Sequence, residues 1–145
     1  MMRKTIRKDL IRIKIAGIRD CITLVMDNLP GSYEEYSRLG LIKDGIYKRM
    51  EFAIEDVLDI CAIINTDLAL GIPSADEDIF VHLTDRGIYT AQIMAQVRLM
   101  RGFRNIVVHR YGTIDDRLAF TLLHEQLPDF DAFIAETEKY LHDAR

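Results

Sequence analysis

The sequence predicts an all-α protein, an up-and-down bundle of four long helices with one or two short ones. Apolar residues recur every three or four positions along nearly the whole chain, and no stretch alternates with a period of two for long enough to form a strand. Only 3 prolines and 8 glycines punctuate 145 residues, which leaves room for long helices. With 49% apolar residues at this length, we expect a single domain, residues 1–145, with a genuine core.

The first two helices follow from the periodicity and from one break. Apolar residues from about residue 6 to residue 29 cover a wide arc, so we expect this helix to contact two neighbours. Residues 28–32, NLPGS, end it, and Ser32 can cap a short helix over residues 33–38, YEEYSR. The second long helix runs from about residue 42 to residue 70, and its broad apolar arc predicts that it is the central one.

A second break separates the central helix from a short one. Residues 70–78, LGIPSADED, combine Gly and Pro and therefore end the central helix. Either Ser74 or Asp76 is expected to cap a short helix that continues through Leu83. Gly87 then ends this short helix.

The last two long helices share a turn that begins with a glycine. The third long helix is predicted over residues 89–111, with Gly112 as the residue that ends it. Asp115 or Asp116 is expected to cap the final helix. Pro128 either kinks that helix or begins a new one in its first turn. The wide apolar arcs of these helices also suggest a dimer face.

Charge and composition restrict the classes of function. A net charge of -4 argues against a general nucleic-acid coating protein. Residues 1–50 nevertheless carry 11 Lys and Arg against 6 Asp and Glu, so they could offer a basic surface to a polyanion or an acidic partner, or simply form solvated helix faces. No run of 18 apolar residues predicts a membrane span, and the basic N-terminus lacks the apolar core of a secretory signal. Cys21 and Cys61 are interpreted as buried thiols of a cytoplasmic protein.

The third long helix carries a polar face. Arg98, Arg101, Asn105 and His109 are spaced three, four and four residues apart, so they fall within about 80° of one another on a helical wheel. Arg104 flanks this face at roughly 140° from His109. A cleft formed by two copies of the helix would bring Arg104 and His109 together more easily than a single chain does.

Two interpretations of this polar face remain open. Arginine binds phosphate oxygens and stabilises charge that develops on phosphorus, while histidine transfers protons near neutral pH. Together they suffice for RNA transesterification without a metal ion, and no acidic metal-ligand cluster accompanies them in the sequence. Arginines and a histidine late in a helix also complement the helix dipole and bind its last carbonyl groups, which would be a purely structural role.

The stretch around residues 104–111 resembles a known family. Arg104 is followed by NIVV, His109, Arg110 and Tyr111, which is the Arg-x4-His-x-Tyr motif of HEPN domains, specifically of the HepT-like toxins that pair with small nucleotidyltransferase antitoxins. Asn105 after the arginine, MRGFRN before the motif and GTIDD after it are similar to the same family. The resemblance covers most of the chain.

The resemblance implies a fold, an activity and a partner. The fold would be a HEPN-like bundle that forms a symmetric homodimer with both motifs in a shared cleft. The activity would be that of a type VII-like toxin, a metal-independent endoribonuclease without a cofactor, in which Arg104 and His109 carry catalysis. Tyr111 would receive AMP from a cognate minimal nucleotidyltransferase antitoxin, which adds negative charge beside the phosphate-binding arginine. Arg98, Arg101, Asn105 and Arg110 could support the site or bind RNA.

Two questions stay open at the level of sequence. Glu55 and Asp59 share a face of the central helix and could orient Arg104 or His109, or they could form a solvated or salt-bridged stripe. The alternative function is that of a non-catalytic subunit that binds nucleotide or substrate for a nucleotidyltransferase. A helical scaffold without an active site is the third reading.

Overall fold

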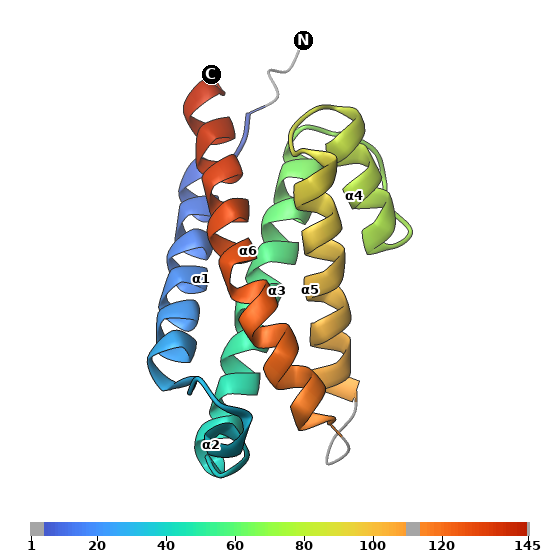
Figure 1. The fold of residues 1–145 in the computed structure, drawn as a ribbon. Helices are drawn as coiled ribbons and strands as arrows, with labels where there is room; N and C mark the ends of the chain where they lie inside the picture. Colours follow the sequence, from blue (N-terminus) through green and yellow to red (C-terminus); the bar gives the residue numbers. More distant parts are fainter. Residues whose placement is uncertain (1–4, 110–113, 145) are drawn as a thin grey trace.

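The computed structural model describes residues 5–109 and 114–144, and the side chains of Val108 and His109 lie outside this description. The described residues form six helices and no strand, which confirms the predicted all-α class with four long and two short helices (Figure 1). The helices are α1 Lys8–Asn28, α2 Tyr33–Ser37, α3 Leu41–Asp67, α4 Asp76–Asp85, α5 Ala91–His109 and α6 Asp116–Asp143.

The four long helices pack side by side in an up-and-down arrangement (Figure 1). Helix α3 contacts both α1 and α5, and α6 contacts the same two helices from the other side. The short α2 connects α1 to α3 at one end of the bundle, and α4 lies beside α3 and α5 toward the other end. Helix α3 buries side chains along its whole length, as expected for the predicted central helix. These include Ile46, Met50, Ile54, Val57, Cys61 and Ile64.

Several predicted helix ends are confirmed. The Ser32 hydroxyl accepts a hydrogen bond from the amide of Glu35 and caps α2. Asp115, one of the two expected residues, caps α6 by accepting from the amide of Leu118 at 3.1 Å. Helix α6 then continues without a break through Pro128, so this proline does not begin a separate helix.

The predicted cap of α4 is wrong. The N-cap residue is Ala75, and no side chain at that position caps the helix. Instead the Asp78 carboxylate reaches back and accepts hydrogen bonds from both the amide and the hydroxyl of Ser74, at 2.9 and 2.8 Å. Ser74 therefore donates to a residue inside the helix, whereas an N-cap serine accepts from one.

Helix α5 begins two residues later than predicted. Tyr89 is buried, with its hydroxyl 2.7 Å from that of Thr137, and Thr90 accepts a hydrogen bond from the amide of Ile93. The helix ends in the structure at His109, and the predicted end at Tyr111 with Gly112 lies outside the described residues. Both cysteines are buried free thiols, as predicted. None of the described helices is long and apolar enough to cross a membrane.

Candidate functional site

A row of three arginines runs along α5 beside its buried face. The buried face of α5 packs into the core and sets the orientation of the helix; it consists of Ile93, Val97, Met100, Phe103 and Val107. Arg98, Arg101 and Arg104 follow one another at intervals of three residues, and their side chains are 34%, 28% and 30% exposed. With a rise of about 1.5 Å per residue, neighbouring arginines lie about 4.5 Å apart along the helix axis. We call these three residues the arginine row.

The first two arginines of the row share one carboxylate. Arg98 donates from Nε to both oxygens of Glu77 on α4 at 2.9 and 3.0 Å, and one of its terminal nitrogens lies 2.8 Å from the same group. A terminal nitrogen of Arg101 lies 3.6 Å from Glu77. Both guanidinium groups also lie over the ring of Phe80, at 5.6 and 5.1 Å from its centroid. Hydrogen bonding from Arg98 lowers the pKa of Glu77, so this carboxylate stays charged at neutral pH.

The third arginine faces a different helix. Nε of Arg104 lies 3.8 Å from Oε1 of Glu55 on α3. Asp59, which shares a helix face with Glu55, instead binds Lys14 on α1 at 2.9 Å. The structure thus brings Glu55, but not Asp59, to Arg104.

The rest of the motif is described only in part. The Asn105 side chain is exposed on α5. His109 is the last residue of α5, but its side chain lies outside the description, as do Arg110 and Tyr111. The motif thus begins on a packed helix, and its last residues lie outside the described part of the chain.

The start of α6 is fixed to α3 by a short polar cluster. Asp116 accepts hydrogen bonds from Nζ of Lys43 and from the hydroxyl of Tyr47, both at 2.6 Å. Burial opposes ionisation of Asp116, but the bonds from Lys43 and Tyr47 outweigh it and lower the pKa of its carboxyl group. Burial and the bond to Asp116 raise the pKa of Tyr47. A cavity of about 200 Å³ lies beside these residues and also contacts Ile114. The cluster lies at the start of α6, which follows the motif in the sequence.

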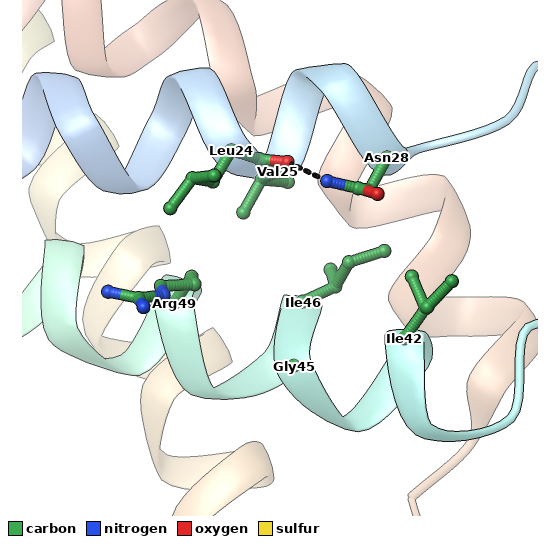
Figure 2. A pocket seen from close by; sticks show the side chains of 7 residues that line it. All are labelled: Leu24, Val25, Asn28, Ile42, Gly45, Ile46 and Arg49. Atoms are coloured by element: carbon green, nitrogen blue, oxygen red, sulfur yellow. Dashed lines mark hydrogen bonds between the residues drawn. The ribbon is translucent and has the colours of Figure 1, made fainter.

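Another cavity lies away from the arginine row. It has a volume of about 260 Å³ and opens between the C-terminal half of α1 and the N-terminal half of α3 (Figure 2). Apolar side chains from both helices face it, and Arg49 stands at one end, as Figure 2 shows. It contains none of the residues that the sequence predicted for the site.

Sequence reasoning missed Glu77, which forms ion pairs with both Arg98 and Arg101. Glu77 precedes Arg98 by 21 positions and sits in the first turn of α4, where an acidic residue is ordinary. Only the packing of α4 against α5 brings it to the arginines. Among the side chains that the structure describes, no three His, Cys, Asp or Glu residues lie close enough to hold a metal ion.

Known proteins resemble this chain in sequence and in structure. The mRNA nuclease HepT of Shewanella oneidensis is 29% identical over 126 residues, which is 87% of this chain and 94% of the relative. A toxin–antitoxin structure with AMP-PNP superposes with a TM-score of 0.81 at 27% identity, and it covers 90% of this chain and 98% of its own. The tri-AMPylated HEPN toxin of Shewanella oneidensis in complex with MNT antitoxin matches with the same score, identity and coverage.

A more distant structure shares the fold alone. The cytosolic protein YutE of Bacillus subtilis, whose function is unknown, superposes with a TM-score of 0.79 at 15% identity over 94% of this chain and 91% of its own. The sequence profile of the family described as "Ribonuclease HepT-like" matches residues 18–137, which is most of the chain and includes all three arginines of the row, Glu55, Glu77 and the complete motif. The chain therefore belongs to the ribonuclease HepT-like family.

Proposed function

We propose that this protein is the toxin of a toxin–antitoxin pair and acts as a metal-independent endoribonuclease in the cytoplasm. The observation that carries the proposal is the complete Arg104-x4-His109-x-Tyr111 motif at the end of α5 in a chain of the ribonuclease HepT-like family. The names of its relatives, an mRNA nuclease and a toxin bound to its antitoxin, support the same activity.

Arg104 and His109 carry the chemistry in this proposal. Histidine removes the proton of the RNA 2′-hydroxyl or supplies one to the leaving 5′-oxygen. Arginine stabilises the negative charge that grows on the phosphoryl oxygens in the transition state. Arg104 lies in a packed part of α5, and its side chain is 30% exposed, so part of the guanidinium group is accessible to RNA. Arg101 and Arg98 continue the row and bind neighbouring phosphates, and Asn105 and Arg110 adjoin Arg104 and His109 in the motif.

The proposed active form is a symmetric homodimer in which two α5 helices face each other. Support comes from the exposed strip of α5 that contains Ala95, Leu99 and Gly102. The Leu99 side chain is 59% exposed, and a Cβ atom added at Gly102 would meet no atom of the described residues within 4 Å. A glycine inside a helix is unfavourable, so its value is expected to lie in allowing a second helix to approach closely.

The antitoxin in this proposal is a minimal nucleotidyltransferase that transfers AMP to Tyr111. A relative of 27% identity is described as a tri-AMPylated toxin in complex with MNT antitoxin, which supports this mode of control. Each AMP group adds a phosphate, and Tyr111 stands two residues after His109. The phosphate of AMP would bind the arginines in place of RNA, or its negative charge would repel the RNA phosphates. Both effects use the same electrostatics that bind the substrate.

RNA cleavage by the purified chain tests the proposal. We expect the wild-type protein to cut single-stranded RNA in the presence of a chelator, and the Arg104→Ala and His109→Ala variants to lose at least about 100-fold in rate. Full activity of either variant would remove that residue from the mechanism. If the wild-type chain leaves RNA intact but binds nucleotide through Arg104, the alternative role as a nucleotide- or substrate-binding subunit of a nucleotidyltransferase holds instead.

Mass spectrometry after co-expression with a cognate minimal nucleotidyltransferase tests the control mechanism separately. We expect an increase in mass that corresponds to one or more AMP groups on the peptide that contains Tyr111. A neutralised complex in which Tyr111 is unmodified would mean that the partner inhibits by covering the site.

A further inference from the structure

The Arg104 side chain turns one nitrogen inward. Its Nε is shielded from solvent and makes no hydrogen bond with any described residue, although the side chain as a whole is 30% exposed. Oε1 of Glu55 lies 3.8 Å from this nitrogen, which is close enough for an ion pair but too long for a hydrogen bond. The inward edge of the guanidinium group therefore faces a carboxylate that would have to move by less than about 1 Å to accept a hydrogen bond.

The geometry of a guanidinium group makes this edge important. Its five N–H donors lie in one rigid plane, so an interaction at Nε fixes the direction in which the two terminal nitrogens point. A buried N–H group without an acceptor is unfavourable, and the Glu55 carboxylate is the acceptor that can relieve this by a small side-chain rotation. When Glu55 holds Nε, the two terminal nitrogens point away from Glu55 and can bind a phosphate.

The neighbouring acidic residues of α3 are engaged elsewhere. Glu51 binds Lys48 on its own helix at 2.8 Å. Asp56 and Asp59 both face Lys14 of α1, at 3.6 and 2.9 Å. Of these four acidic residues, Glu55 is the one that forms its described ion pair with a residue of α5.

We propose that Glu55 is a positioning residue for RNA cleavage, which holds the Nε edge of Arg104 so that its terminal nitrogens face the scissile phosphate. This inference rests on the proposed ribonuclease function and deepens it. Glu55 is 41% exposed and lies on a different helix from the motif, so it acts through Arg104. Displacement of a catalytic group by about 1 Å can cost about 100-fold in rate, which is the scale of effect that loss of such a contact can have.

Three variants separate this role from a general effect of charge. Glu55→Gln removes the charge but retains the shape, and Glu55→Ala removes both. Asp59→Asn is the matched control, because it removes one carboxylate from the same helix face while its ion pair is with Lys14. We expect kcat to fall by about 10- to 100-fold in Glu55→Ala and by less in Glu55→Gln, with KM nearly unchanged and with wild-type kinetics in Asp59→Asn.

A double-mutant cycle tests whether Glu55 acts through Arg104. In the Arg104→Lys background the Nε–H group is absent, so adding Glu55→Ala should cause little further loss of kcat. Equal losses from Glu55→Ala in both backgrounds would overturn the proposal, as would wild-type kcat in Glu55→Ala.

A measurement that needs no activity completes the test. Nitrogen-15 NMR of arginine side chains reports the Nε–H signal of Arg104, which the Arg104→Lys variant assigns by its loss. We expect faster hydrogen exchange of this signal in Glu55→Ala and unchanged exchange in Asp59→Asn; an unchanged signal in Glu55→Ala would contradict the proposed contact. If the wild-type protein leaves RNA intact, the ribonuclease proposal itself is wrong, and with it the role of Glu55 in cleavage. The NMR result distinguishes this outcome from the absence of the Glu55–Arg104 contact.

Discussion

The hydroxyl of Tyr47 donates a hydrogen bond of 2.6 Å to Oδ1 of Asp116 and so ties α3 to the first residue of α6. Lys43, one turn earlier on α3, binds the other oxygen of the same carboxylate. Tyr47 is 5% exposed, so its hydroxyl is largely shielded from water. The contact fixes the start of α6, which follows the motif in the sequence.

Tyr47→Phe is expected to destabilise the protein because it leaves the partly buried Asp116 carboxylate without one of its two donors. Hydrogen bonds to charged groups are worth about 1.5–3 kcal/mol, and we expect a loss in that range in urea-induced unfolding. Tyr33→Phe is the matched control, since Tyr33 makes its contacts with Phe120 and Arg117 through its ring. Equal losses in the two variants would show that the Asp116 contact contributes nothing special.

Stability should also depend on pH through Asp116. Its pKa in the folded protein lies below the usual value, so its contribution is fully present above the unfolded pKa of about 3.9 and is lost as pH falls through the folded pKa. Thermal unfolding measured from pH 6 to pH 2 should therefore show a smaller acid-induced loss in Asp116→Asn than in the wild type. Identical pH profiles would mean that Asp116 is not a source of this acid sensitivity.

Arg98 and Arg101 are expected to bind RNA phosphate in competition with Glu77. Alanine at either arginine should weaken binding and reduce the slope of log affinity against log salt by about 0.7, the value for one phosphate contact on single-stranded nucleic acid. Glu77→Gln should strengthen binding because it frees donors that Arg98 now gives to the carboxylate. Arg38→Ala is the control, since Arg38 pairs with Glu34 on α2, away from the row. Weaker binding in Glu77→Gln would mean that Glu77 orients the arginines and does not compete for them.

Gly102→Leu should separate folding from dimer formation. A Cβ atom added at Gly102 meets no atom of the described residues within 4 Å, and replacing glycine inside a helix gains about 0.5–1 kcal/mol in helix propensity. We therefore expect an equal or higher melting temperature together with a shift from dimer to monomer in analytical ultracentrifugation and a loss of RNA cleavage. Gly45→Leu on α3, where an added Cβ atom also meets no described atom within 4 Å, should leave the dimer intact. A Gly102→Leu dimer would exclude close packing at this position.

Local signals in the sequence predicted the fold well. Periodicity located all four long helices, and neighbouring residues predicted the Ser32 cap and narrowed the cap of α6 to Asp115 or Asp116. The prediction that Ser74 or Asp76 caps α4 was wrong because Ser74 donates to Asp78, and whether a serine near a helix start donates or accepts depends on how the turn is folded. The start of α5 shifted because Tyr89 is held by Thr137, 48 positions away.

The polar residues of α5 could be identified along one helix, but their partners on other helices could not. The wheel arithmetic identified the polar residues of α5, and the motif gave their expected roles. The carboxylates that face them come from two other helices, and spacing alone could not distinguish Glu55, which reaches Arg104, from Asp59, which binds Lys14. A tilt or rotation of α3 by a few tens of degrees would exchange such partners, and that orientation is set by the packing of the whole bundle.

The chemical ends of the RNA fragments test the central claim most directly. In the proposed mechanism Arg104 and His109 assist attack by the RNA 2′-hydroxyl. This attack leaves a 5′-hydroxyl on one fragment and a 2′,3′-cyclic phosphate, or the phosphate monoester formed by its hydrolysis, on the other. We predict these ends for fragments that the purified wild-type chain releases in the presence of a chelator, and no such fragments from Arg104→Ala. Fragments with 5′-phosphate ends, or cleavage by Arg104→Ala at the wild-type rate, would contradict the account.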